Sequence, residues 1–320
     1  MKKVKSDISV VFPYYNEEKT LPKTLELIKN QTLPPREVIF VNSSSTDSSS
    51  ALIDRWIEEN QSEIKFHNVF EGSNTPGSSK NVGIRRAKSS WIAFMDCGLL
   101  FEETWLEKQW KYIEENKALI VSGMVHSVGV GLIDTSAVAQ TYGYKRSRPC
   151  VPSTLLEKDL FKKTGLFIEN RRSGYDAVWQ IALKKLGVER KVNEDVVIKY
   201  NGVNYGKSLG FIYKKSALYA TASMGLKYYR GPYYNLILFF LGVFISLSFP
   251  YLIPGLFLGY LFLRGFLIPI RKSRGLGIFK EFSLSFLSLP LVGLTIDCGR
   301  IVGFTKGFFN TFTYFFNKTT

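Results

Sequence analysis

The sequence predicts an α/β domain with a mostly parallel, Rossmann-like sheet, followed by a C-terminal helical segment that spans or lies on a membrane. In the first hundred residues, short apolar runs alternate with amphipathic stretches, which is the order of strands and helices in a parallel sheet. No charged residue occurs from Gly231 to Leu263, whereas residues 1–230 mix both signs. The length of 320 residues allows two compact units.

Short runs rich in β-branched and aromatic residues are predicted to be buried strands at residues 8–12, 37–41, 64–69, 91–95 and 119–124. Between them, helix faces are predicted at Leu21, Leu25 and Ile28, at Leu52, Trp56 and Ile57, and later at Val178, Ile181, Ala182 and Leu186. Because ligands of such sheets lie beyond the carboxyl ends of the strands, the polar residues that follow the strands are expected to share one edge.

The C-terminal part is predicted to be a membrane anchor over residues 233–320. A single helix over residues 231–263 would be about 50 Å long, longer than the ~30 Å hydrocarbon core of a bilayer. Pro250 and Pro254 would also break it, so a hairpin over residues 233–270 fits better. A further apolar helix, at about residues 282–305, is expected to span, to re-enter or to lie in the interface, and the sequence leaves these three alternatives open.

Basic residues flank this hairpin on both sides, in a linker over residues 201–232 and at Arg271, Lys272 and Arg274. Segments rich in Lys and Arg next to membrane spans usually face the cytoplasm. The sequence therefore predicts a protein of the cytoplasmic membrane whose large domain faces the cytoplasm. The basic flanks also account for the net charge of +15 through anionic head groups, so no nucleic-acid partner is expected. The three cysteines and two histidines fit no metal-ligand spacing.

Four polar motifs follow the predicted strands or precede one of them. They are Pro13-Tyr14-Tyr15-Asn16-Glu17, Asn42-Ser43-Ser44-Ser45-Thr46-Asp47, Lys80-Asn81-Val82-Gly83 and Asp96-Cys97-Gly98. In this order and spacing they resemble the inverting family-2 glycosyltransferases with a GT-A fold, over residues 7 to about 190. The resemblance implies a donor-binding half over residues 1–115 and an acceptor-binding half, which supplies the catalytic base, over residues 116–200.

The resemblance implies that the first half binds a nucleotide-sugar donor. The donor contacts carried over to this chain are Pro13, Tyr15, Glu17, Ser43, Lys80, Asn81, Asp96 and Gly98. Physically, a cation such as Lys80 suits a diphosphate and an aromatic ring such as Tyr15 suits a nucleotide base. The alternative for Lys80 is a solvated lysine on a helix surface, with no role in binding.

Two of these motifs depart from the family. Asn42 and Ser43 stand where a pair of aspartates is usual, and Gly98 replaces the second acid of the Asp-x-Asp motif, which leaves an Asp-x-Gly variant. In the family this motif holds a divalent cation against the diphosphate. Because Mg²⁺ binds through one or two carboxylates and substrate phosphates, Asp96 is predicted to hold Mg²⁺ or Mn²⁺. The alternative is that Asp96 only caps the turn.

The stretch from Gly165 to Asp176 resembles the family segment whose aspartate abstracts the acceptor proton. Asp176 matches this base, although Tyr175 replaces the preceding glutamate. Ser173 and Asp176 also have the spacing of a helix capping box, which is the structural alternative. Arg171 and Arg172 are predicted to contact a phosphate of the donor or of the acceptor, or else to be solvated.

The sequence thus predicts an inverting glycosyltransferase that transfers a sugar from a nucleotide donor to a membrane-held acceptor, such as a lipid-linked saccharide or a polyprenyl phosphate, in cell-envelope polysaccharide or glycolipid synthesis. The departures leave a second hypothesis: a catalytically silent membrane scaffold of the same fold, or a sugar-nucleotide-binding protein without transferase activity. A lipid-binding adaptor would need only the anchor. A sugar-nucleotide pyrophosphorylase is disfavoured, because it needs a Gly-rich basic loop after the first strand.

Overall fold

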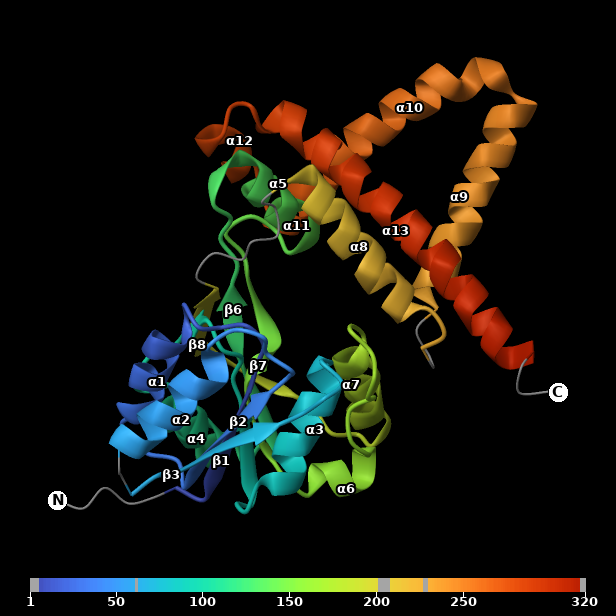
Figure 1. Ribbon diagram of the computed structural model, residues 1–320. Coiled ribbons are helices and arrows are strands. Elements are labelled where there is room, and N and C mark those ends of the chain that lie inside the picture. Colours follow the sequence, from blue (N-terminus) through green and yellow to red (C-terminus); the bar gives the residue numbers. More distant parts are fainter. Residues whose placement is uncertain (1–5, 61–62, 201–207, 227–229, 317–320) are drawn as a thin grey trace. The chain divides into compact units, whose positions relative to one another are not determined.

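The computed structural model describes residues 6–60, 63–200, 208–226 and 230–316 (Figure 1). Contacts divide the chain into two units, one formed by Met1–His126 with Ser147–Asn201 and the other by Ser127–Arg146 with Gly202–Thr320. The division differs from the predicted boundaries, because residues 127–146 join the C-terminal unit instead of the acceptor-binding half. No sequence pattern in residues 127–146 indicates that they belong to the C-terminal unit.

The first unit is built on a sheet whose strand order is β3-β2-β1-β4-β7-β6-β8-β5. The strands are β1 Ile8–Tyr14, β2 Glu37–Asn42, β3 Lys65–Phe70, β4 Trp91–Phe94, β5 Leu99–Leu100, β6 Ile120–His126, β7 Ser147–Glu157 and β8 Lys191–Tyr200. Strand β1 runs parallel to β2 and β4, and β2 runs parallel to β3, as the alternating pattern predicts. Strand β7 is antiparallel to β4 and β6, so the sheet as a whole is mixed.

Helices cover both faces of this sheet (Figure 1). On one face lie α1 Leu21–Lys29, α2 Ser49–Glu59 and α4 Trp105–Asn116; on the other lie α3 Pro76–Arg86, α6 Leu160–Thr164 and α7 Tyr175–Lys185. Successive residues of a strand point to opposite faces, so Val10 and Phe12 enter the first core and Val11 enters the second. This three-layer arrangement confirms the predicted α/β class.

Helix α7 buries a different face from the one predicted. Its buried residues are Trp179 and Leu183, whereas Leu186 is 47% exposed. The Trp179 ring lies 5.2 Å, between ring centroids, from both Phe161 and Phe167. The large aromatic surface of Trp179 gains most from burial, and it rotates the helix away from the predicted aliphatic face.

The second unit is helical. Its elements are α5 Gly131–Thr141, α8 Leu209–Ser223, α9 Gly231–Ser248, the 3₁₀ turn η1 Pro250–Leu252, α10 Ile253–Phe262, the π-helix η2 Leu263–Leu267, α11 Ile268–Ser273, α12 Gly277–Glu281 and α13 Ser285–Phe316. The predicted linker over residues 201–232 contains helix α8; its residues 201–207 and 227–229 lie outside the described part of the chain.

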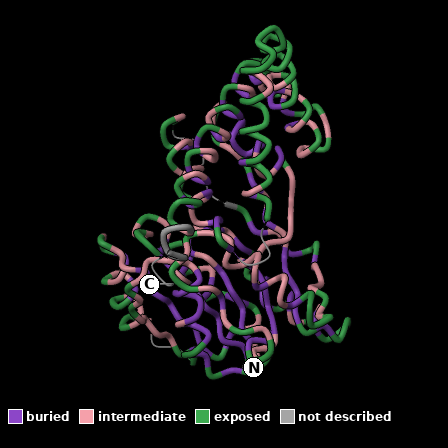
Figure 2. Tube along the Cα trace, turned by 90° about the vertical axis from the view of Figure 1, so that its right-hand side faces the viewer, coloured by how far each residue is buried: buried purple, intermediate pink, exposed green. Residues whose placement is uncertain are grey.

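Three stretches of the second unit are long and apolar enough to cross a membrane: Gly231–Ser248, Pro250–Ser273 and Ser285–Thr311. The first two meet at Pro250, as predicted, and the third is longer than the predicted helix at about residues 282–305. The first two stretches consist mostly of exposed residues, whereas the third is more buried (Figure 2). Such a surface needs an apolar partner in place of water.

A charged pair lies inside two of these apolar stretches. Arg264, in η2, is 4% exposed, and its Nε lies 2.7 Å from Oδ2 of Asp297 in α13. The Tyr260 hydroxyl donates to the same Oδ2 at 3.0 Å, and an Arg264 amino group donates to the carbonyl oxygen of Gly293 at 3.2 Å. Both charges of this pair are thereby matched by polar partners.

Candidate active site

The loops that follow β1 and β2 are joined by hydrogen bonds at the carboxyl edge of the sheet. The backbone N–H of Ser43 donates to the carbonyl oxygen of Tyr14 at 2.9 Å. The backbone N–H of Asn16 donates to the Ser45 hydroxyl at 3.1 Å, and that of Thr46 donates to Oδ1 of Asn16 at 2.8 Å. These bonds hold the first two predicted motifs as one rim of the site.

The first loop presents an aromatic ring and a carboxylate. Pro13 lies in β1, and the Tyr15 side chain, just beyond the strand, is 39% exposed. Glu17 is fixed by its backbone N–H, which donates to the Ser49 hydroxyl at 2.8 Å. Burial raises the pKa of the Glu17 carboxyl; a hydrogen bond from Thr20 opposes this shift, and the charge of Asp96 adds to it.

We expect Glu17→Gln to raise the melting temperature at pH 7 and to weaken donor binding. Because the folded-state pKa of Glu17 is raised, its ionised form costs stability above the pKa of the unfolded chain, about 4.3, and costs nothing below it. The gain from Gln is therefore expected at pH 7 and absent near pH 4. Thermal unfolding at both pH values checks this, with Glu18→Gln as the matched control. A variant that melts lower than the parent at pH 7 contradicts it.

Ser43 points its hydroxyl into the protein. It is 6% exposed, and its Oγ lies 2.6 Å from the Oγ of Ser79 in α3. Ser79 in turn donates to Glu71 Oε2 at 3.1 Å. Asn42 closes the adjacent turn, because its Oδ1 accepts from the backbone N–H of Ser45 at 2.8 Å. The second motif is thus tied to α3, and a base contact at Ser43 stays a prediction.

A buried ion pair lies at the centre of the site. Nζ of Lys80, in α3, is 2.8 Å from Oδ1 of Asp96, which follows β4. The Lys80 side chain is 1% exposed and that of Asp96 is 33% exposed. Nζ also lies 5.7 Å from the ring centroid of Tyr175 in α7. Three motifs far apart in the sequence therefore meet at one ammonium group.

The environment keeps this ammonium charged. Burial alone would lower the pKa of Lys80, but the charge of Asp96, with Tyr175, outweighs it and raises that pKa. The Tyr175 hydroxyl is itself desolvated, and burial raises its pKa to about 12, with the opposing charge of Lys80 as the next influence. Lys80 is therefore a fixed positive charge at the strand edge, which is what a leaving diphosphate needs.

The Asn81 side chain is held inside the protein by hydrogen bonds. It is fully buried, its Oδ1 accepts from the backbone N–H of Phe167 at 3.0 Å, and its Nδ2 donates to the carbonyl oxygen of Phe167 at 2.8 Å and to Glu169 Oε1 at 2.9 Å. These bonds fix the segment that leads into α7. A donor contact at Asn81 stays a prediction.

Gly98 has a backbone conformation that explains the missing second acid. Its φ of +80° is one that L side chains rarely adopt, and a Cβ there would lie 3.2 Å from Glu17 Oε2 and 3.4 Å from Thr20 Oγ1. A second carboxylate at residue 98 would be crowded against that of Glu17. Cys97, between Asp96 and Gly98, is buried, and burial raises the pKa of its thiol well above the ordinary range, which suits a filler and not a nucleophile.

Asp176 lies in the first turn of α7 and is partly exposed. The N-cap of this helix is Gly174, with φ of +80°, one residue after the Ser173 that was predicted to cap it. Arg190, which the sequence analysis missed, lies close enough to interact with Asp176. Burial lowers the pKa of its guanidinium, and Cys150 and Asp176 act against that shift. No periodicity or motif marks Arg190, because it comes from the turn before β8.

The two predicted phosphate contacts lie on the segment before α7. Arg172 is exposed, and one of its amino groups donates to the carbonyl oxygen of Asn74 at 3.3 Å, next to the start of α3. Arg171 is partly buried. The contact from Arg172 joins the two segments, and a role of either arginine in binding phosphate stays a prediction.

A divalent cation fits here only with help from the substrate. The described residues contain no group of three or more His, Cys, Asp or Glu side chains that would hold a metal. Asp96 is one-third exposed, and only its Oδ1 pairs with Lys80, which leaves Oδ2 for a further partner. One carboxylate with donor phosphates is a known way of holding Mg²⁺, so the residues present fit such an ion.

Comparisons with known proteins bear on the family and the fold. Residues 9–163 match the family model Glycosyl transferase family 2. The chain is 30% identical over 184 residues, 55% of its length, to an uncharacterized glycosyltransferase of Rickettsia bellii, and it spans 26% of that protein. It is 28% identical over 123 residues, 38% of its length, to the poly(ribitol-phosphate) beta-glucosyltransferase of Bacillus spizizenii, and it spans 19% of that protein.

A solved structure has the same fold. The mannosyltransferase of Pyrobaculum calidifontis, in complex with GDP-Man and Mn²⁺, is similar with a TM-score of 0.57 and 16% identity, over 94% of this chain and 87% of that one. This similarity confirms the predicted GT-A fold. Residues 9–163, just under half of the chain, are identified by the family match as a domain of glycosyltransferase family 2.

Proposed function

We propose that this chain is an inverting glycosyltransferase that transfers a sugar from a nucleotide-sugar donor to an acceptor held at a membrane, in the synthesis of a cell-envelope polymer or glycolipid. The observation that carries the proposal is the Lys80–Asp96 pair at the strand edge of a family-2 domain. Lys80 is buried, and its carboxylate partner Asp96 is partly exposed and can be reached by the substrate. A polymer as the acceptor is supported by the Bacillus relative, which is named for poly(ribitol-phosphate).

The donor is proposed to lie over the rim formed by the first two loops. Tyr15 offers an exposed ring for the nucleotide base, and Lys80 offers a positive charge for the diphosphate. Asp96, with the donor phosphates, would hold Mg²⁺ or Mn²⁺, and when bound the ion adds positive charge that stabilises the leaving diphosphate. The positive charge of Lys80 would also stabilise the diphosphate, and it is always in place because the side chain is buried.

Asp176 is proposed as the general base. It is in the first turn of α7, directly after Tyr175, whose ring lies beside Lys80. In an inverting transfer the acceptor hydroxyl attacks the face of the sugar opposite the leaving diphosphate, and the base takes its proton. Asp176 is thus a carboxylate beside the proposed diphosphate contact at Lys80, and it is suited to that role.

The membrane part of the proposal rests on the three apolar stretches of the second unit. Basic residues lie at the ends of the first two, including Arg230 before α9 and Arg271 and Lys272 in α11. By the positive-inside rule these flanks, and with them the catalytic domain, face the cytoplasm. An enzyme anchored in this way meets acceptors that are confined to the same membrane.

The test is donor binding followed by turnover in the full chain. We expect one sugar nucleotide from a panel to raise the melting temperature, by an amount that corresponds to about 2.7 kcal/mol at a hundredfold excess over Kd. The rise should be larger with Mg²⁺ or Mn²⁺. In the presence of membrane extract, the full chain should then release nucleoside diphosphate from the donor. Donor binding without release would favour the silent scaffold, and no donor binding would favour the lipid-binding adaptor.

A further inference from the structure

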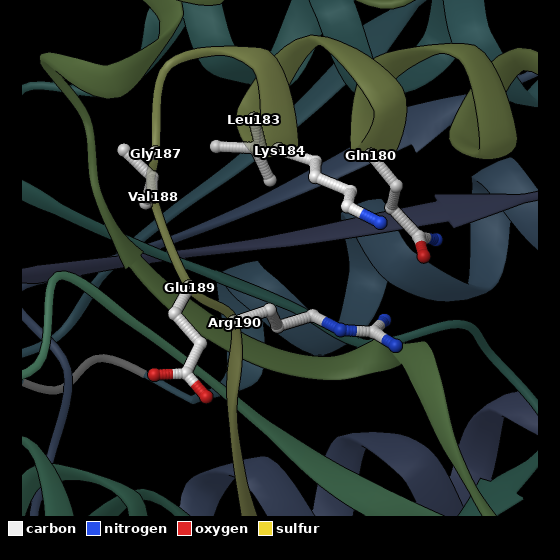
Figure 3. Close-up of a pocket in the computed structure, with 7 residues that line it drawn as sticks. All are labelled: Gln180, Leu183, Lys184, Gly187, Val188, Glu189 and Arg190. Atoms are coloured by element: carbon white, nitrogen blue, oxygen red, sulfur yellow. The ribbon is translucent and has the colours of Figure 1, made fainter.

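A pocket that no motif predicts lies between the C-terminal half of α7 and the turn that leads into β8 (Figure 3). It measures about 370 Å³, which is within the size range of small-molecule sites. Leu183 and Val188 form its apolar wall, and its polar lining comes from Gln180, Lys184 and Arg190. The pocket belongs entirely to the first unit.

Three hydrogen-bond donors face this space. Gln180 and Lys184 are four residues apart and lie on the same side of α7. Gly187, with φ of +70°, reverses the chain so that Arg190 forms the opposite wall. Figure 3 shows the Lys184 ammonium, the Gln180 amide and the Arg190 guanidinium directed to the same side of the pocket. Such a set of donors suits an anion with several acceptor oxygens.

The charges of the pocket favour an anion as well. Glu189 is its one acidic lining residue, and it points away from the guanidinium (Figure 3). Glu189 is also neutralised by Lys191, whose Nζ lies 2.6 Å from its Oε2. Within the described residues, the side chains of Gln180, Lys184 and Arg190 have neither a hydrogen bond nor an ion pair. Two positive charges are therefore available to a ligand.

The pocket adjoins the proposed base. Gln180 lies one helical turn after Asp176 on the same side of α7. Arg190 is partly buried, and its charge interacts with that of Asp176. A group bound by Arg190 and Gln180 would thus be part of the molecule whose hydroxyl Asp176 deprotonates, and Lys80 and Asp96 remain for the donor.

We propose that this pocket binds a phosphate group of the acceptor, with Arg190 as its main contact and Lys184 and Gln180 as further donors. A planar guanidinium binds phosphate through two parallel hydrogen bonds, and the ammonium and amide supply the other oxygens. The inference rests on the proposed transferase function and adds that the acceptor is a phosphate ester with a separate hydroxyl: the hydroxyl attacks the sugar, and the bound phosphate only holds the acceptor. The same chemistry comes from a lipid phosphate or from a soluble phosphate ester.

The test measures phosphate binding to the full chain in phosphatidylcholine nanodiscs by ³¹P NMR line broadening. One arm adds glycerol 3-phosphate, and the other includes a long-chain polyprenyl phosphate in the nanodisc. We expect Arg190→Gln to weaken binding by about tenfold or more, and Lys184→Gln by several-fold, since hydrogen bonds to charged groups are the strong ones. Arg190→Lys should keep part of the affinity. Binding in the lipid arm alone assigns a lipid phosphate, and equal binding in both arms assigns a soluble ester.

Lys185→Gln is the matched control, because Lys185 is in the same last turn of α7 but does not line the pocket. Its phosphate affinity should stay within twofold of the parent. Nucleoside diphosphate affinity is measured in parallel and should not change in Arg190→Gln. No phosphate binding by the parent, equal binding by Arg190→Gln, or an equal loss of both ligands in that variant would each overturn the inference. If the parent protein binds phosphate but no nucleotide sugar, the proposed function is contradicted instead.

Discussion

Asp176→Asn is expected to lower turnover by about 10²–10⁴-fold and to leave donor affinity nearly unchanged. The amide keeps the shape of the side chain but cannot take a proton from the acceptor hydroxyl. The folded state should tolerate the change, because Asp176 is partly exposed and the helix is capped at Gly174 without it. Single-turnover rates and donor titrations on the same preparation measure the two effects separately.

Asp159→Asn serves as the control for this variant. Asp159 is an exposed acid before α6 that pairs with Lys162 at 2.8 Å, so its loss should change neither rate nor donor affinity. If Asp176→Asn keeps its rate within twofold, or loses rate only in proportion to unfolded protein, Asp176 is not the base. A pH–rate profile of the parent should show one group that must be deprotonated, and the variant should lack it.

Asp96→Asn is expected to destabilise the domain by about 3 kcal/mol. Lys80 is 1% exposed, and this substitution leaves its ammonium buried without the carboxylate. Because the folded-state pKa of Lys80 is raised, the pair contributes its full stabilisation below the unfolded-state pKa of lysine, about 10.4, and loses it as pH rises through the folded-state value. The deficit of Asp96→Asn should therefore be constant from pH 6 to 9. Urea unfolding across this range is the measurement.

Lys80→Met with Asp96→Asn gives the matching test of the pair. Removing both charges should recover more than half of the lost stability, because no buried charge remains uncompensated. The double variant should still fail to bind the donor diphosphate. Additive losses in the double variant would mean that the two side chains are not coupled. Unchanged metal-dependent donor binding in Asp96→Asn would contradict the proposed role of Asp96 with Mg²⁺ or Mn²⁺.

The strands and the rim of the site follow from local sequence patterns. Residues 8–12 and 37–41 are short, β-branched and bounded by turn residues, and these properties act over a few positions. The polar loops after them share an edge because parallel strands run in one direction. Both features are therefore visible without knowledge of distant contacts.

Features that depend on pairing between distant segments were not predictable. The hydrogen bonds between Asn81 and Phe167 join positions 86 residues apart, and no local pattern marks them. The reason for Gly98 is a carboxylate at Glu17, in another loop. Helix α7 offers both an aliphatic and an aromatic face, and only the position of Phe161 and Phe167 decides in favour of Trp179. Arg190 becomes a candidate only because the fold brings it close to Asp176 in α7.

In the proposed membrane anchor, the Arg264–Asp297 pair has a consequence for insertion. Either residue alone at the centre of a membrane-spanning helix opposes insertion by about 2.5–3.5 kcal/mol. Paired at 2.7 Å and joined by Tyr260, they no longer need water as a partner. The stretches Pro250–Ser273 and Ser285–Thr311 are therefore expected to insert together, as one cooperative step of biogenesis. A chain arrested between them would present an arginine to lipid without its counter-ion.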